Sequence, residues 1–208
     1  DYEPMFMTAC ETLIFPWVED PDRSDETHIC LVLDTPQGEW TRRVSRQHGV
    51  HGDLSGFAVQ TEAGHDKLQA VCAQIGEREP NIRSYFREQR AAVGEGGVLV
   101  IGHPHVPWLC GQISPEAMIY HALDYPDAFG TSMEAIYQAS CIVFDIASEA
   151  GIDFMSESSY GLEMTSPDQF AAQDLPYTRH LADWTHQHDG LFWYHNCGQT
   201  RTLIRDGQ

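Results

Sequence analysis

The sequence predicts an α/β fold built on a parallel sheet, and three observations lead to this fold class. From residue 94 onward, short apolar runs alternate with helical segments, which is typical of βαβ units. A separate pair of strand-like runs flanks a tight turn before that region. The length of 208 residues suits one domain. We therefore expect a single domain over residues 1–208, with a hairpin at 29–45 and the βα units that carry the functional site at 94–208.

The hairpin is the first element that the residues justify. Residues 29–33 form an apolar run, and residues 39–44 return as a second strand. Between them, Pro36 presets the backbone φ angle and Gly38 supplies a positive φ, which is the chemistry of a turn. The first 15 residues are apolar enough to be partly buried, but no element is predicted there.

Helical periodicity predicts two helices after the hairpin, at 65–75 and 81–93, the second starting at Pro80. Later helices are predicted after Ser114-Pro115, from about 126 to 150, and from Ser166-Pro167 to about 188, with serine caps before two of them. Strands are predicted at 98–101, 152–155 and 190–194. The first of these strands is β-branched and bounded by glycines, as in a strand that is covered on both faces.

Composition excludes several classes of protein. The chain has 12 Lys and Arg against 31 Asp and Glu, a net charge of −19, which disfavours binding to nucleic acid or to an anionic membrane surface. We find no apolar run near the roughly 18 residues that a membrane span requires. The six cysteines are scattered without a C-x-x-C pair, so we expect free thiols, a reducing compartment and a cytoplasmic location.

Polar residues follow the three predicted strands, where parallel sheets place their chemistry. His195 and Cys197 have i, i+2 spacing, so in a strand an imidazole and a thiolate would face one ion such as Zn²⁺. The alternative is a buried cysteine beside a hydrogen-bonded histidine. Glu157 is a candidate metal ligand, general base or substrate contact, and otherwise an exposed loop acid. His103 and His105 are candidates for catalysis or binding, and otherwise solvent-exposed loop histidines.

These three strand ends, in this order, resemble the uroporphyrinogen decarboxylase superfamily. The resemblance covers about residues 29–205. The matching segments are Thr35-Pro36-Gln37-Gly38, Val100-Ile101-Gly102-His103-Pro104, Ser156-Glu157-Ser158-Ser159-Tyr160-Gly161, Ser166-Pro167-Asp168-Gln169-Phe170 and His195-Asn196-Cys197-Gly198. The last segment is similar to the H-x-C-G motif of the superfamily's zinc-dependent methyltransferases, which move methyl groups between corrinoid proteins and thiols.

The resemblance implies a (β/α)8 TIM barrel, which typically needs about 250 residues. We therefore expect part of such a barrel, truncated, with fewer than eight parallel strands and apolar side chains left under-covered at an edge. The resemblance also implies that His195 and Cys197 hold the metal and that Glu157 faces the same cavity, and the polar residues at the strand ends predict the remaining roles. The metal ligands would be His195, Cys197 and Glu157; the catalytic residues Glu157 and His103; and the substrate-binding residues Ser158, Tyr160 and His105. We expect the side chains of His195, Cys197, Glu157 and His103 to point into one concavity.

The leading functional hypothesis is a zinc-dependent methyltransferase that moves a methyl group between a corrinoid on a partner protein and a small thiol. One alternative is a uroporphyrinogen decarboxylase acting on a tetrapyrrole. It would need cationic side chains near the strand ends, where the nearest in sequence are Arg179 and Arg201. A second alternative is a catalytically silent barrel that acts as a binding protein. Two departures from the family are the missing N-terminal arginine-rich segment and the missing stretch that would carry a third thiolate ligand.

Overall fold

A computed structural model describes residues 5–47, 56–104, 106–159 and 166–196. The described strands form two sheets, a parallel sheet in the order β1-β5-β6-β7 and an antiparallel sheet in the order β2-β3-β4. The strands of the parallel sheet are β1 (Met5–Ala9), β5 (Val98–Pro104), β6 (Phe154–Ser159) and β7 (Leu191–Asn196). The strands of the antiparallel sheet are β2 (Val18–Asp20), β3 (His28–Leu33) and β4 (Trp40–Ser45).

The helices of the described residues connect consecutive strands of the parallel sheet. They are α1 (Cys10–Ile14), α2 (Glu62–Ala73), α3 (Ile75–Val93), α4 (Pro115–Asp124), α5 (Pro126–Glu149), α6 (Pro167–Gln169) and α7 (Leu175–Gln187). A 3-10 segment, η3 (Val106–Gly111), follows β5, and a π-helical turn, η5 (Phe170–Asp174), joins α6 to α7. None of these helices is long and apolar enough to cross a bilayer.

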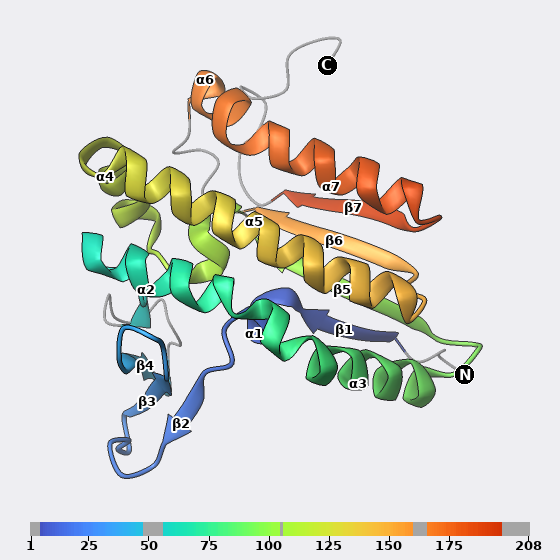
Figure 1. Ribbon diagram of the computed structural model, residues 1–208, viewed down its shortest axis with the longest axis horizontal. Helices are drawn as coiled ribbons and strands as arrows, with labels where there is room; N and C mark the ends of the chain where they lie inside the picture. The colour runs from blue at the N-terminus through green and yellow to red at the C-terminus, as the bar shows by residue number, and fades with distance from the viewer. Residues whose placement is uncertain (1–4, 48–55, 105, 160–165, 197–208) are drawn as a thin grey trace.

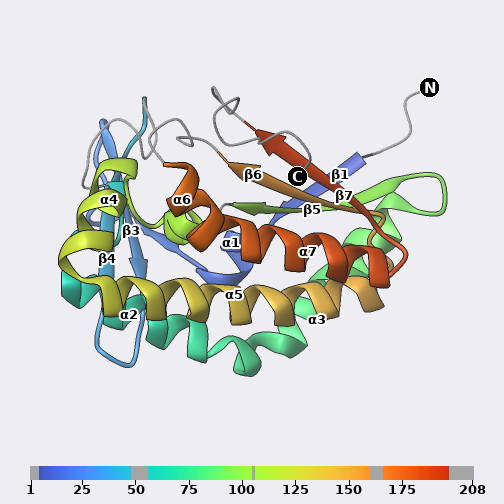
Figure 2. The same cartoon turned by 90° about the horizontal axis from the view of Figure 1, so that it is seen from above.

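The main helices cover one face of the parallel sheet. Figures 1 and 2 show α3, α5 and α7 on the same side of the strands, with α2 beside α5. Strand alternation directs Leu99, Ile101 and Met155 towards these helices, where all three are fully buried in the main core. Phe86 of α3 and Phe144 of α5 complete this core from the helix side. The α/β fold class and its parallel sheet are therefore confirmed.

The opposite face of the parallel sheet carries exposed apolar side chains. The exposed fraction is 62% for Met7 of β1, 63% for Leu191 and 52% for Trp193 of β7. Val98 of β5, which strand alternation places on the same face of the sheet as Met7, is also exposed. Four parallel strands in the described residues, with under-covered side chains on both edge strands, agree with the expectation of fewer than eight strands. In this part of the chain the sheet is open, and a closed barrel is not formed.

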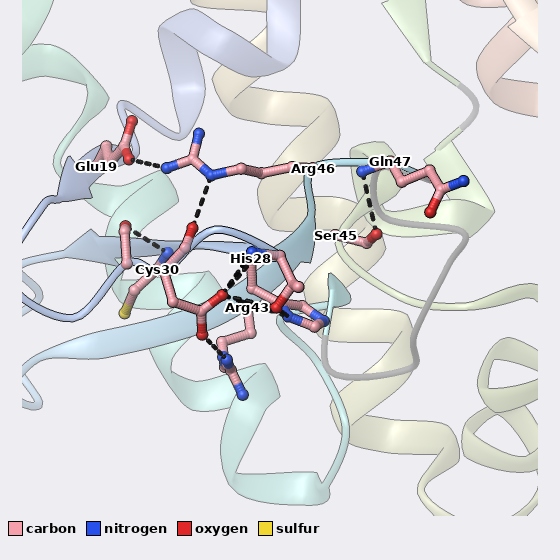
Figure 3. A network of polar contacts seen from close by, with 10 residues as sticks. Glu19, His28, Cys30, Arg43, Ser45, Arg46 and Gln47 are labelled. Carbon is pink, nitrogen blue, oxygen red and sulfur yellow. Dashed lines mark hydrogen bonds and ion pairs between the residues drawn. The ribbon is translucent and has the colours of Figure 1, made fainter.

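The antiparallel sheet contains the predicted hairpin, β3 and β4, and one strand that the sequence did not predict, β2. Trp40 fixes the hairpin to the core, because its indole Nε1 donates a 3.1 Å hydrogen bond to the carbonyl of Ala58. Figure 3 shows the exposed polar network of this sheet, in which Arg46 donates to Glu19 at 2.9 Å. Arg43 donates to Asp25 at 2.6 Å, so these arginines are neutralised by carboxylates.

Two predictions about elements need correction. Strand β1 lies within a segment for which we predicted no element, and it pairs with β5 from Met5↔Val98 to Ala9↔Gly102. Helix α3 begins at Ile75, so Pro80 lies inside it rather than at its start. Proline removes one backbone hydrogen bond there, and burial of Ile82 and Phe86 offsets that loss. As expected, the five described cysteines are free thiols.

Ser166 caps the helical segment that leads to α7, and its replacement tests this part of the fold. Its hydroxyl accepts from the backbone N–H of Gln169 at 3.2 Å, and the Gln169 side chain accepts from the N–H of Ser166. We expect Ser166→Ala to lower the free energy of unfolding by about 1 kcal/mol, because it leaves a helix N–H without its acceptor. Ser166→Asp keeps an acceptor and should stay close to wild type in urea denaturation; equal losses in both variants would contradict the capping role.

Candidate functional site

The carboxyl ends of β5, β6 and β7 lie side by side, so the three sequence motifs meet at one edge of the sheet. In the register of the parallel sheet, His103 pairs with Glu157 and Glu157 pairs with Tyr194. Ser158 pairs with His195 one residue further along. Parallel α/β sheets bind ligands at this edge, which makes it the candidate site.

His195 lies on the helix-free face of the sheet and is exposed. It is two residues beyond Trp193, which is also exposed on that face. The two rings meet edge to face, with centroids 5.8 Å apart and planes at 79°. The imidazole is therefore positioned by an aromatic neighbour on a face that a ligand can reach. Cys197, its predicted partner in metal binding, lies outside the described residues.

Glu157 points the other way, towards the helix layer. It has the same strand parity as Met155, whose sulfur accepts a hydrogen bond from Thr185 of α7. Thr178 lies about two helical turns before Thr185 in α7, and its hydroxyl donates a hydrogen bond to Glu157 Oε1 at 3.2 Å. Glu157 is 1% exposed. The alternative of an exposed loop acid is therefore wrong.

The expected single concavity is not formed by Glu157 and His195. Ser158 takes the pairing position opposite His195, and strand alternation puts the neighbouring Glu157 on the other face. Glu157 therefore does not face an ion held by His195. The sequence identified both strand ends, but the direction of each side chain depends on the phase of β6 relative to α7.

The other predicted site residues are placed only in part. His103 and Ser158 lie at the ends of β5 and β6, in register with Glu157 and His195 respectively. His105, Tyr160 and Cys197 lie outside the described residues. The catalytic, substrate-binding and metal roles of these five residues stay predictions.

Glu157 belongs to a buried pair of acids with Asp174, the last residue of the π-helical turn. Burial raises the pKa of Glu157 to about 7, and the hydrogen bond from Thr178 opposes part of this increase. Burial, and next the nearby Glu157 carboxylate, raise the pKa of Asp174 to about 8. Glu157 Oε2 has no hydrogen-bond partner among the described residues. Carboxyl groups with such pKa values can take up or release a proton near neutral pH.

The described part of the chain offers few side chains for metal ligation. There, no group of three or more His, Cys, Asp or Glu side chains gathers in a way that could hold a metal ion. An imidazole and a thiol still form a donor pair that zinc accepts. A zinc site at His195 would therefore need Cys197 and at least one more ligand from outside the described residues or from a substrate.

A second polar cluster near the strand ends was missed by the sequence reasoning. Arg42 of β4 lies with its guanidinium carbon 4.7 Å from the centre of the Trp17 ring, and its Nη1 donates to Gln112 at 3.5 Å. Burial lowers the pKa of Arg42 to about 10, while the carboxylate of Glu11 opposes this change. Arg42 Nε and Glu11 Oε2 are buried without hydrogen-bond partners among the described residues. No sequence spacing relates these residues, which come from three separate segments, at 11–17, 42 and 112.

This cluster adjoins the same edge of the parallel sheet. Glu11 lies in α1, directly after β1, and Gln112 follows the 3-10 segment after β5. Glu11 Oε2, Arg42 Nε and Glu157 Oε2, which are buried without a hydrogen-bond partner in the described residues, therefore fall into two groups, both beyond or at strand carboxyl ends. Such atoms are uncommon in folded proteins and each calls for a physical explanation. Their positions agree with a functional role for this edge.

Comparison with known proteins adds little to this geometry. No protein-family model matches the chain, and no curated protein matches its sequence. Among solved structures, the chain is similar to a methyltransferase from Methanosarcina mazei, with a TM-score of 0.47 and 18% sequence identity. The match covers 84% of this chain and 48% of the other, so the chain spans about half the length of that methyltransferase. At this level of similarity the match identifies neither a family nor an activity.

Proposed function

We propose that this chain is a zinc-dependent methyltransferase that transfers a methyl group to a small thiol, with His195 and Cys197 as zinc ligands. The observation that carries the proposal is the position of His195. It is exposed on the helix-free face at the carboxyl end of β7, two residues before Cys197. The H-x-C-G sequence supports the same assignment.

Each candidate residue has a defined part in this proposal. When bound, zinc would lower the pKa of a coordinated thiol, so that the thiolate nucleophile exists near neutral pH. The imidazole of His195 would bind the ion through one ring nitrogen, while contact with Trp193 limits the rotation of the ring. Cys197 would supply the thiolate ligand. The methyl donor would be a corrinoid on a partner protein, as the sequence resemblance implies.

The proposed role of Glu157 differs from the metal-ligand role that was predicted from the sequence. Because it faces α7 rather than His195, we no longer assign it to the metal. With a pKa of about 7, it is half protonated near neutral pH, and its acid–base chemistry would take place inside the helix layer. Zinc content should therefore be independent of this carboxyl group.

The experiment that tests the proposal measures zinc and methyl transfer together. Purified protein would be dialysed, assayed for zinc by atomic spectroscopy, and incubated with methylcobalamin and coenzyme M. We expect about one zinc per chain and formation of the methyl thioether. Protein that contains no zinc and forms no thioether would contradict the proposal.

A second candidate function, decarboxylation of a tetrapyrrole polycarboxylate, is favoured by the position of Arg42. The decarboxylase hypothesis lacked cationic groups near the strand ends in the sequence, and folding brings Arg42 beside the segments that follow β1 and β5. Arg42 also lines a pocket of about 400 Å³ on the antiparallel sheet, together with Arg23 and Arg43, which are paired with Glu39 and Asp25. Conversion of uroporphyrinogen to coproporphyrinogen without zinc would support this function, and absence of both activities would support a binding protein.

A further inference from the structure

Three buried polar side chains join three helices at a place distant in sequence from the strand-end motifs. His65 of α2 lies between Ser132 of α5 and His121 of α4. Its Nδ1 is 2.9 Å from Ser132 Oγ, and its Nε2 is 2.9 Å from His121 Nδ1. His65 and Ser132 are fully buried, and His121 is nearly so. The three residues form a continuous hydrogen-bonded relay from α5 to α4.

The direction of every hydrogen bond in the relay follows from Gln69. Its side-chain amide nitrogen contacts the carbonyl oxygen of Ala128 at 3.4 Å and Ser132 Oγ at 3.2 Å. A carbonyl oxygen only accepts, so this nitrogen donates, and Ser132 Oγ accepts from it. Ser132 therefore has its own O–H to donate, and the nearest ring nitrogen is Nδ1 of His65.

The same reasoning sets the tautomers of the two histidines. Because Nδ1 of His65 accepts, the ring proton lies on Nε2 and is donated to Nδ1 of His121. His121 then also carries its proton on Nε2. Both rings are neutral in this arrangement, and every nitrogen between the two outer ends has a partner of the right kind.

The surroundings of the relay favour the neutral state. Burial, and next the neighbouring His121, lower the pKa of His65 to about 4, while the Asp66 carboxylate opposes this change. Burial also lowers the pKa of His121, against the opposing effect of Asp124. The remaining contacts are aromatic edges from Phe129 and Tyr125. Two carboxylates are thus the charged groups that act on the relay, and they do not overcome burial.

A proton on His65 breaks this arrangement. It would place an N–H on Nδ1, and the Ser132 oxygen would then have to accept from both Gln69 and His65. The Ser132 O–H would lose its acceptor, and a cation would be buried between two helices. The effect falls mainly on α4, whose buried residues are only Met118 and His121, whereas α5 has a long buried face.

We propose that His65, His121 and Ser132 form a pH-sensitive lock, which holds α4 against α2 and α5 while both rings are neutral and releases α4 when His65 is protonated. The lock is independent of the proposed methyltransferase chemistry. Helix α4 follows the 3-10 segment after β5, so its release would disturb the chain directly behind the candidate site. Acidification would therefore loosen the site through His65, in addition to the protonation of Glu157 and Asp174 themselves.

Amide hydrogen exchange of α4 tests the proposal in the intact chain. Protection factors, which correct for the intrinsic effect of pH on exchange, would be compared at pH 7.5 and pH 5, with α3 as an internal reference. We expect protection of α4 to fall about 30-fold. This is the change in the opening equilibrium between pH 7.5 and pH 5 when His65 has a pKa of about 4 in the lock and 6.5 after release. Protection of α3 should change much less.

Variants separate the lock from ordinary packing. His65→Gln keeps a donor towards His121 but cannot be protonated, so the fall in α4 protection between pH 7.5 and pH 5 should be much smaller than in wild type, with His121 accounting for what remains. His186→Gln replaces an exposed histidine of α7 and should retain the wild-type response. A wild-type response in His65→Gln, or an α4 in wild type that is equally protected at both pH values, would overturn the proposal.

A spectroscopic measurement needs no variant. Imidazole ¹⁵N chemical shifts at pH 7.5 should show both His65 and His121 as neutral rings protonated on Nε2. A charged His65 ring at pH 7.5, or a proton on its Nδ1, would overturn the assignment of the relay even if every variant failed to fold.

Discussion

Cys197→Ser is expected to lose most of the bound zinc and nearly all thiol methylation. Thiolate is the softer and stronger of the two proposed ligands, and a serine hydroxyl is not ionised near neutral pH. His195 alone would then hold the ion from the exposed face of β7. The measurement is zinc per chain by atomic spectroscopy after dialysis, together with the rate of thioether formation. The rate should fall by at least about 100-fold, since the thiol substrate would no longer be activated.

Two matched variants control this experiment. Cys141→Ser removes a half-buried thiol of α5 that is unrelated to the strand ends, and it should keep both zinc and activity. Glu157→Gln should also keep its zinc, because Glu157 faces α7. If Cys197→Ser holds zinc as tightly as wild type, Cys197 is not a ligand and the methyltransferase proposal loses its chemical basis.

Glu157→Gln is expected to stabilise the protein at pH 8 by about 3 kcal/mol and to leave its stability at pH 4 nearly unchanged. Burial raises the pKa of Glu157 from 4.5 to about 7 in the folded state. The folded state therefore binds more protons between these values, and the contribution of Glu157 to stability is complete below about pH 4.5 and is lost as pH rises through 7. A neutral amide avoids this loss and can still accept from Thr178.

Urea denaturation at pH 4, 6 and 8 measures this effect as a difference between variant and wild type. Asp174 also has a raised pKa, to which the Glu157 carboxylate contributes, so the difference between the two proteins measures Glu157 together with its interaction with Asp174. Glu95→Gln removes an exposed carboxylate between α3 and β5 and serves as the control. A Glu157→Gln protein that is no more stable than wild type at pH 8 would show that the Glu157 charge does not lower the free energy of unfolding at that pH.

The sequence alone determined most elements of the second half of the chain. Strands β5 and β7 follow from apolar runs that are bounded by glycine, and α4 and the helix after Ser166 follow from serine caps and proline at the first helical position. These signals are local, because a cap or a turn depends on residues a few positions apart. The strand-end motifs were located by the same signals, since a polar residue after a buried strand marks where that strand ends.

Only the tertiary structure decided which side chains share a site. Glu157 and His195 follow equally clear strands, yet one faces α7 and the other faces away, because strand phase relative to the helix layer is set by packing. Strand β1 was missed for a related reason: its five residues are extended by pairing with β5, which is 93 residues away at Met5↔Val98.

The two clusters that the sequence did not indicate are also products of tertiary structure. Arg42 meets Gln112 across 70 residues, and His65 meets His121 across 56 residues, so no short spacing could relate them. The properties of these groups come from burial, which lowers the pKa of both Arg42 and His65. Residue type determined what chemistry this chain can perform. Packing determined which side chains are buried away from water, and burial is what makes their acid–base behaviour differ from that of a free side chain.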